Sequence, residues 1–308
     1  MGFTARAVRT DYWMPGENYL KKIVKAVENK VSDGDIVVIS EKAISVAMGL
    51  IIDEGGVKPS SLARFLARFW MRFVWGYFLG ALCHLREINI KRLREYPLKE
   101  GSAHKEVALR HAGFLHALMW GSEGGIDGSN LPYAYVSLPL NCAQEVAEEV
   151  REYIKAKLNR DVIVMVVDTD KTYSFRNFHF TYRLKPIKGI HTFLGFVAYV
   201  VGRSLRLKCR PTPLALAGAK MSIDLTLNIA EAAEKARGYG SGRTVWDMVE
   251  KFGVGLTGVT WDMLKRLEHK PIVVIKLRSS KPKTGKKKYK KKKYKYGSTH
   301  IENTCFPG

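Results

Sequence analysis

No apolar run in this sequence is long enough to cross a lipid bilayer. The longest, FVWGYFLGALC at 73–83, has eleven residues, whereas a membrane-spanning helix needs about 20. Arg6, Arg9 and Asp11 also interrupt any apolar signal peptide at the start of the chain. The sequence therefore predicts a soluble protein without a membrane partner.

Cysteine is scarce, and no two cysteines are close in sequence. Cys83, Cys142, Cys209 and Cys305 form no CxxC pair, although cysteines paired at short spacing are the usual mark of a structural zinc site. Thinly spread cysteines are typical of reducing compartments. The sequence thus argues against zinc and predicts a cytoplasmic protein.

Acidic residues are also few for a chain of 308 residues. Lys and Arg outnumber Asp and Glu by 51 to 29, for a formal net charge of +22. Ten lysines and one acid, Glu302, place +9 on residues 279–308 and leave +13 on residues 1–278. A body this basic suits an anionic ligand, such as a nucleotide or a phosphate-bearing coenzyme, and is also compatible with nucleic acid.

Residues 279–308 are of low complexity, with lysines interleaved with Tyr289, Tyr294 and Tyr296. Their like charges repel and they lack an apolar pattern, so we expect a disordered basic tail. The tail could bind a polyanion such as nucleic acid through counterion release and stacking, or it could have no dedicated partner. We therefore divide the chain into a folded domain at 1–278 and a tail at 279–308.

Helix and strand patterns alternate along the folded domain. The apolar run DVIVMVV predicts a strand buried on both faces, and the alternation predicts an α/β to α+β fold with mixed sheets and flanking helices. In chain order the patterns predict a helix at 17–30, a strand at 36–40, a helix at 59–85, two strands within 107–120 that turn at Gly113, a helix at 142–158 capped by Asn141, a strand at 161–167, a strand-rich segment at 188–209, a helix within 211–238 and a closing strand at 271–278.

Two aspartates lie where strands meet loops. The segment GSEGGIDGSN at 121–130 places Asp127 among glycines just before a strand, and Asp168 ends the apolar strand. Two carboxylates on two loop ends can hold Mg2+ or Mn2+, which prefer oxygen ligands and leave room for phosphate. Ser129 and Asn130 can donate hydrogen bonds to an anion. Ordinary turn and cap chemistry uses the same residue types, so this alternative stays open.

Three segments, GGIDGSN, SLPL and VIVMVVDTD, resemble the central signature of the coenzyme F-420-0 gamma-glutamyl ligase family. Those enzymes join L-glutamate to a phospholactyl deazaflavin, with GTP hydrolysis and a divalent metal. The resemblance implies an intertwined homodimer of that fold and a metal site of Asp127, Asp168 and Thr169. It also implies a nucleotide contact from Asn130, and it assigns no catalytic residue.

The segment KAISVAMG at 42–49 both matches the family and departs from it. It resembles the family pattern K-x-x-S-K-A-E-G, which implies nucleotide contacts from Lys42 and Ser45. Val46 stands where the family has a nucleotide-binding lysine, and Met48 where it has a glutamate. Because charge-assisted hydrogen bonds to phosphate are strong, nucleotide binding should be weaker unless another base replaces the lysine.

Two later segments depart as well. The chain lacks the arginines that follow the second aspartate motif in the family, and Lys171, Arg176 or Arg183 could supply the missing charge. The loop GYGSGR at 238–243 has no acidic residue where the family often has a metal ligand. Three interpretations follow: a GTP- and metal-dependent ligase that adds L-glutamate to a deazaflavin or related acceptor, a divergent ligase-fold binding protein, and a nucleic-acid-binding protein.

Overall fold

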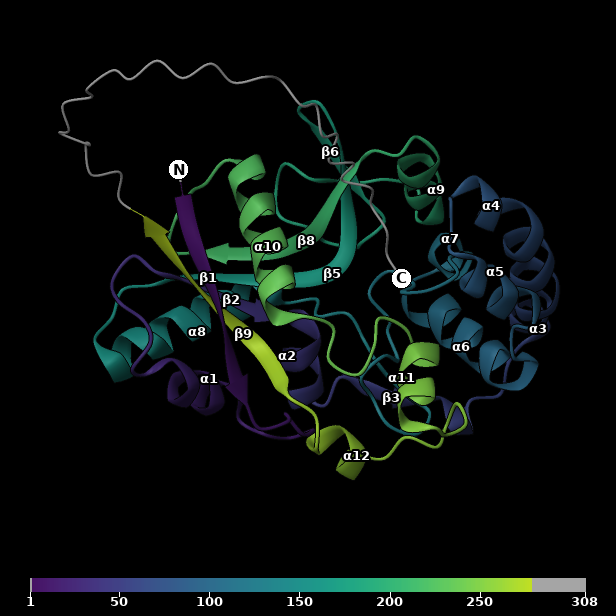
Figure 1. Ribbon diagram of the computed structural model, residues 1–308, viewed down its shortest axis with the longest axis horizontal. Helices are drawn as coiled ribbons and strands as arrows, with labels where there is room; N and C mark the ends of the chain where they lie inside the picture. Colours follow the sequence, from purple (N-terminus) through teal and green to yellow (C-terminus); the bar gives the residue numbers. More distant parts are fainter. Residues whose placement is uncertain (1, 279–308) are drawn as a thin grey trace, which may run out of the picture.

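A computed structural model describes residues 2–278 as a mixed β-sheet with helices on both faces and a helical lobe at one end (Figure 1). The predicted tail at 279–308 lies outside the described residues. In sheet order the strands of the main sheet are β1 (Gly2–Thr10), β9 (His269–Arg278), β2 (Ile36–Ser40), β5 (Ile163–Phe175), β6 (Phe178–Thr181) and β7 (His191–Thr192), with β8 (Lys208–Ala217) paired to β5, while β3 (Ile51–Asp53) and β4 (Tyr135–Ser137) form a separate pair.

The centre of the main sheet is the parallel pair β2 and β5. Ile36 lies opposite Ile163 and Ser40 lies opposite Val167, whereas β9 and β8 pair antiparallel with β2 and β5. The strands expected at 36–40 and 271–278 are present, and the mixed sheet with flanking helices agrees with the predicted fold class. β1 has no counterpart among the predicted elements. The homodimer stays a prediction.

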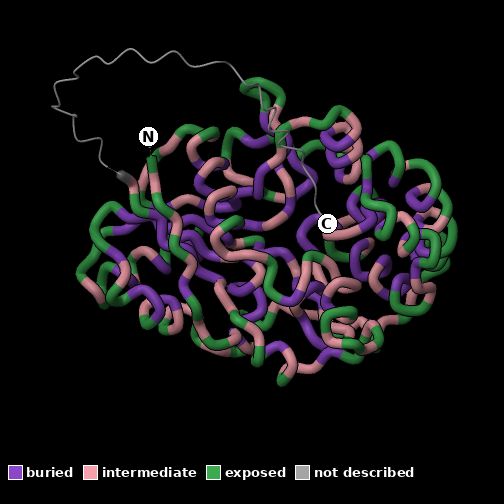
Figure 2. Tube along the Cα trace, in the orientation of Figure 1, coloured by how far each residue is buried: buried purple, intermediate pink, exposed green. Residues whose placement is uncertain are grey.

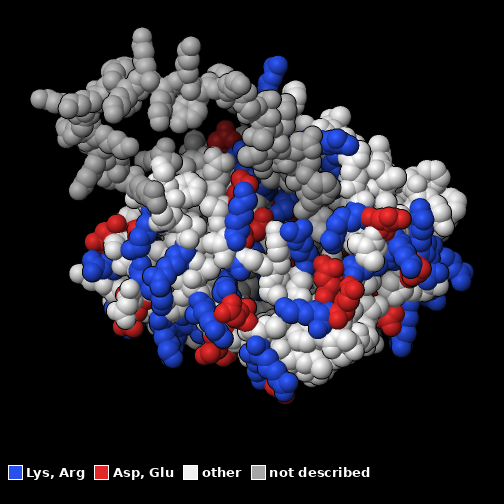
Figure 3. Space-filling model, viewed as in Figure 1, with Lys and Arg blue, Asp and Glu red and all other residues white. Residues whose placement is uncertain are grey.

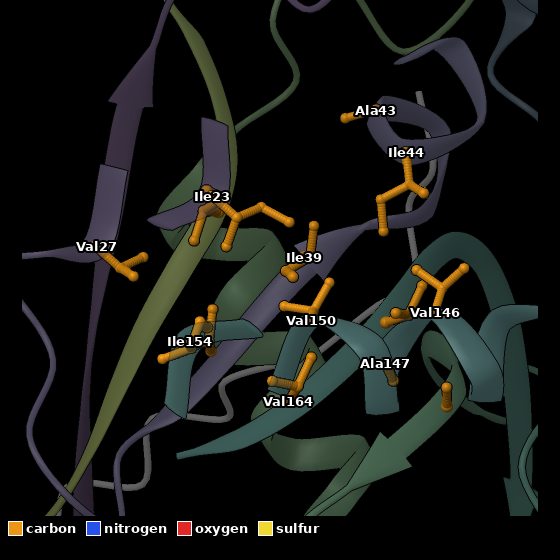
Figure 4. Close-up of a cluster of buried hydrophobic side chains, with 14 of the residues drawn as sticks. Ile23, Val27, Ile39, Ala43, Ile44, Val146, Ala147, Val150, Ile154 and Val164 are labelled. Atoms are coloured by element: carbon orange, nitrogen blue, oxygen red, sulfur yellow. The ribbon is translucent and has the colours of Figure 1, made fainter. Parts of the chain in front are cut away.

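Helices cover both faces of this sheet. α1 (Tyr19–Val27) and α8 (Ala143–Leu158) pack on one face, and α10 (Ile223–Arg237) packs on the other. Each presents an apolar stripe at helical spacing, which is why its sequence pattern is recognisable. The buried side chains that meet between α1, α8 and the sheet include Ile23, Val27, Ile39, Val146, Val150, Ile154 and Val164 (Figure 4).

The helical lobe has a separate apolar core around Trp75 and Tyr173, both fully buried. Buried segments run through this lobe as well as through the sheet in Figure 2. The expected helix at 59–85 is present, but its central part winds as a π-helix. The elements of the lobe are α3 (Ser61–Phe65), the π-helical segment Leu66–Leu79, α4 (Gly80–Leu82), α5 (Glu87–Arg94), α6 (Leu98–His111), α7 (Phe114–Ala117) and α9 (Phe196–Ser204).

The prediction of two strands within 107–120 is wrong, because α6 and α7 occupy this segment. Gly113, at φ +87°, separates the two helices instead of turning a hairpin. The inner face of α6 carries Lys105 and Glu106, which are buried with partners far away in sequence. These buried charges interrupt the apolar stripe by which a helix is recognised.

The prediction of a strand-rich segment at 188–209 is also wrong, because only β7 and the first two residues of β8 are strand there and α9 occupies its centre. The run FVAYVVG is apolar on every side, and a short run of this kind has the same pattern in a buried helix and in a buried strand. Gly202 packs directly on the Tyr173 ring, where a Cβ atom would come within 2.2 Å of Cγ. The helix therefore depends on contacts that the local sequence does not show.

Three short helices complete the described fold, together with a single 3-10 turn. Cys142, not Asn141 as predicted, precedes α8, and its side chain makes no capping bond. No helix within residues 2–278 is both long and apolar enough to span a membrane. The short helices are α2 (Glu41–Ala47), α11 (Val245–Phe252) and α12 (Trp261–Lys265), and the 3-10 turn is Glu54–Gly56.

Candidate functional site

A cavity of about 1370 Å3 opens between the sheet and the helical lobe. Its wall includes Ser40, at the carboxyl end of β2, and Asp168, the residue of β5 directly after its parallel pairing with β2, and α6 borders it on the lobe side. Ligands in α/β proteins bind at this edge of the sheet, and the volume exceeds that of typical small-ligand pockets. Lys and Arg side chains outnumber acidic ones on the face of the molecule shown in Figure 3.

Asp168 does not end β5 as predicted, because the strand continues to Phe175. Asp168 pairs with Thr212 of β8, and the next paired residue, Lys171, faces Pro211. Two extra residues on β5 therefore form a bulge directly after Asp168. Such bulges re-aim side chains next to functional sites, and here the whole segment Asp168–Asp170 lines the cavity.

Arg183 holds Asp168 in place from inside the protein. Its Nε donates to Asp168 Oδ2 at 2.5 Å, its Nη2 to Glu41 Oε1 at 3.0 Å and its Nη1 to the Gly124 backbone oxygen at 2.8 Å. Burial raises the pKa of Glu41 to about 7 against the attraction of Arg183. A Cβ atom at Gly125 would lie 2.5 Å from the guanidinium carbon, so this position requires glycine.

Asp170 is the functional candidate that sequence inspection missed. Its side chain is buried, and its Oδ2 has no hydrogen-bond partner in the described part of the chain. Burial, followed by the negative charge of Asp168, raises the pKa of Asp170 well above its ordinary value. The sequence DTD indicates that Asp168 and Asp170 share a face, since residues two apart on a strand do so. Asp170 was missed because the strand was predicted to end before it.

The structure brings together Lys42, a predicted nucleotide contact, and Asp127, a predicted metal ligand. Lys42 Nζ donates to Asp127 Oδ2 and, at 2.8 Å, to Ser129 Oγ. The Ser129 backbone nitrogen donates to Asp127 Oδ1 at 2.6 Å. The backbone of Asp127 also bridges to Ser137 of β4. Asp127 is therefore held at the cavity wall by a helix, a turn and a strand.

Asn130 lines the cavity, but its amide already has protein partners. Its Oδ1 accepts hydrogen bonds from the Ser241 backbone nitrogen at 2.8 Å and from Ser241 Oγ at 2.6 Å. Its backbone oxygen accepts from the Tyr12 hydroxyl. Asn130 thus ties the loop of Asp127 to the glycine loop at 238–243, and its contact with a nucleotide stays a prediction.

The other notable residues of the segment at 42–49 lie in different environments in the folded protein. Ser45 is fully buried, lies 3.5 Å from Glu41 Oε1 through its hydroxyl and is absent from the cavity wall. Val46 lines the cavity, whereas Met48 is exposed and does not. Ser45 therefore does not reach the cavity, whereas Val46, which stands where the family has a lysine, lies on the cavity wall.

A metal ion is compatible with the oxygen atoms gathered here. In residues 2–278 no three His, Cys, Asp or Glu side chains form a group that could hold a metal by themselves. Asp127, Asp168, Thr169 and Asp170 nevertheless line one cavity, and the orphaned Oδ2 of Asp170 is buried among negative charges. Mg2+ and Mn2+ prefer such oxygen donors and take further ligands from phosphate and water, so the donor set fits.

A second charged cluster, the charge tetrad of Glu54, His104, Lys105 and Glu123, lies behind the loop of Asp127. His104 Nδ1 lies 2.7 Å from Glu54 Oε1 and its Nε2 2.9 Å from Glu123 Oε2, while Lys105 Nζ donates to Glu123 Oε1 at 2.5 Å. Burial alone would lower the pKa of His104, but the two carboxylates raise it well above its ordinary value. The tetrad anchors α6 to the segment that carries Asp127.

Two comparisons with known proteins match this chain. A relative from Methanocaldococcus jannaschii, an uncharacterized protein, is 37% identical over 287 residues, which cover 89% of this chain and 96% of the relative. The family model described as F420-0:Gamma-glutamyl ligase matches residues 7–199, a range that contains β2, Asp127 and Asp168. The chain therefore belongs to the coenzyme F-420-0 gamma-glutamyl ligase family.

Proposed function

We propose that this protein is a ligase that uses GTP and Mg2+ or Mn2+ to join L-glutamate to a phosphate-bearing deazaflavin or a related acceptor. One observation carries the proposal: Asp127, Asp168 and Asp170 come from two distant segments and line one cavity at the edge where the parallel pairing of β2 and β5 ends. Family membership supports the reaction class, and the basic body supports anionic substrates.

The cation would be held by Asp127, Asp168, Thr169 and Asp170. Bound there, a divalent cation supplies positive charge that offsets the charge of the transferring phosphate. The protein supplies orientation. Lys42 and Ser129 fix Asp127, and Arg183 fixes Asp168 from the buried side. Because these supports are themselves buried or partly buried, the carboxylates keep their places while substrates enter and leave.

The proposed reaction has two steps. A carboxylate oxygen of the acceptor attacks the terminal phosphorus of GTP, and the bond from that phosphorus to the oxygen retained by GDP breaks, which gives an acyl phosphate. The amino nitrogen of L-glutamate then attacks the acyl carbon, the bond to the phosphate oxygen breaks, and the nitrogen gives up one proton. Amide, GDP and inorganic phosphate are the products. The first step needs GTP and the acceptor bound together, and the second needs the acyl phosphate and L-glutamate bound together. A cavity of about 1370 Å3, larger than a typical pocket for one ligand, is compatible with that demand.

Calorimetric titration with Mn2+ tests the cation site. Asp127→Ala and Asp168→Ala should each abolish the binding seen in the natural protein. Asp262→Ala is the matched control, since the side chain of Asp262 is 82% exposed on α12 and, within residues 2–278, pairs only with Lys265. Unchanged Mn2+ affinity in both cavity variants would remove the central claim.

Phosphate release tests the reaction itself. With GTP, Mn2+ and L-glutamate present, the natural protein should release inorganic phosphate only when a phospholactyl deazaflavin is added. GTP binding without such release would favour the ligase-fold binding protein. Release that does not depend on the acceptor would show a different phosphatase-type reaction and contradict the ligase.

A further inference from the structure

The cations that line the cavity differ in whether the protein already satisfies them. Lys42 is paired with Asp127, and Lys171 Nζ donates to both carboxylate oxygens of Glu234, at 2.6 and 2.9 Å. Lys42 and Lys171, the lysines that the sequence suggested for phosphate binding, therefore already have carboxylate partners. Arg183, another candidate from sequence, is buried behind Asp168 and is absent from the cavity wall.

Among the Lys and Arg side chains of the cavity wall that are partly buried, Arg237 is the exception, since Lys42, Lys171 and Lys270 each pair with a carboxylate. It lines the cavity and is partly buried, yet it makes no hydrogen bond or ion pair with any residue of the described range 2–278. A charge removed from water without a partner carries a desolvation penalty that an ion pair or ligand must offset. The guanidinium group of Arg237 is therefore incomplete without an anion.

The position of Arg237 indicates which part of the cavity that anion would occupy. It is the last residue of α10, and it shares a small void with Ser40 and Val167, the last paired residues of the parallel strands β2 and β5. This edge of the sheet also carries Asp168. Burial lowers the pKa of Arg237 while the negative charges of Glu234 and Asp168 oppose that effect, so Arg237 lies within electrostatic reach of the proposed cation site.

We propose that Arg237 binds a phosphate group of the substrate and takes over the charge that the family places at the position of Val46. The assignment rests on the proposed function, because that function brings a phosphate to Asp168. Arginine suits this role, since its planar group donates two parallel hydrogen bonds to phosphate. Residue 237 lies outside the range 7–199 that matches the family, so the match does not assign it.

A purely structural role for Arg237 has a distinct signature. A cation at the C-terminus of a helix interacts favourably with the helix dipole, and this effect would change stability but not ligand affinity. Arg237→Gln removes the charge, and Arg237→Lys keeps it while losing the planar donor pair. Lys235→Gln is the matched control, because Lys235 is two residues earlier on α10, is 73% exposed and pairs with Glu231 on the surface.

The experiment is calorimetric titration of the full chain with GTP and, separately, with inorganic tripolyphosphate, both with saturating Mn2+. Arg237→Gln should weaken both affinities about tenfold or more, the usual loss for a hydrogen bond to a charged group. Arg237→Lys should recover part of the loss, and Lys235→Gln should bind like the natural protein. The thermal midpoint of each variant reports whether it folds.

The outcomes separate this assignment from the proposed function. If GTP binds equally to the natural protein and to Arg237→Gln, the role of Arg237 is wrong while nucleotide use stands. If tripolyphosphate binding depends on Arg237 but GTP does not bind, the phosphate site stands and the nucleotide is wrong. If neither ligand binds the natural protein, both are overturned. A loss of affinity that matches only a loss of folded protein, and that Arg237→Lys does not recover, also overturns the assignment.

Discussion

Lys105→Met tests whether the charge tetrad supports the fold and the site. Lys105 and Glu123 are both 0% exposed, and Lys105 Nζ also donates to the Met119 backbone oxygen. Methionine has a similar length and an apolar stem, so the substitution removes the ammonium charge without opening a large cavity. Glu123 would keep only His104 as a charged partner.

The expected loss of stability is large for a single substitution. Removing one partner of a buried ion pair costs about 3–5 kcal/mol, because the other charge stays buried. A second estimate comes from Glu123, whose burial would raise its pKa, while Lys105 and His104 lower it to about 2 from an ordinary 4.5. That difference corresponds to roughly 3 kcal/mol, shared between the two cations. We therefore expect Lys105→Met to lower the free energy of unfolding by about 3 kcal/mol.

Urea unfolding at neutral pH measures this loss, with Lys99→Met as the control. Lys99 lies in the first turn of the same helix and is exposed, so its removal should change stability by less than about 0.5 kcal/mol. Because the tetrad anchors the loop of Asp127, Lys105→Met should also weaken Mn2+ binding in protein that is still folded. A loss below about 1 kcal/mol, or one equal to that of Lys99→Met, would refute the argument.

Three further predictions concern pH, nucleotide affinity and the tail. The pKa of His104 is raised well above 6.5 in the folded protein, so the stabilisation that protonated His104 supplies is fully present below pH 6.5 and is lost as pH rises through the raised value. His104→Gln should therefore make the free energy of unfolding in urea depend less on pH across this range. An unchanged dependence on pH would contradict the pairing. Val46→Lys should leave GTP affinity level or lower in the natural chain but raise it by about 1–3 kcal/mol in Arg237→Gln, as read by calorimetry; no gain in either background would count against a shared phosphate role. Deleting residues 279–308 should leave the thermal midpoint nearly unchanged while weakening affinity for a polyanion such as heparin, and a large fall in the midpoint would show that the fold needs the tail.

Local sequence patterns determined the framework of this protein. The strand at β2 and the helices α1, α8 and α10 have periods that follow from how their side chains alternate between core and solvent, and this information is local. The Asp127 and Asp168 motifs were recognisable for the same reason, since each is a short contiguous segment. Lys42 was recognisable in the same way, and it pairs with Asp127, while its contact with a nucleotide stays a prediction.

Tertiary structure alone decided the features that depend on distant partners. α6 was missed because Lys105 lies inside the protein only when Glu123, eighteen residues away, neutralises it. Asp170 reaches the cavity through a bulge, which is a property of the pairing between β5 and β8 and not of either strand. Arg237 stands out only after the other partly buried lysines of the cavity wall have been matched to their acidic partners. The pairing of buried charges and the register of strands depend on segments that are distant in sequence, so neither can be deduced from one segment of the chain.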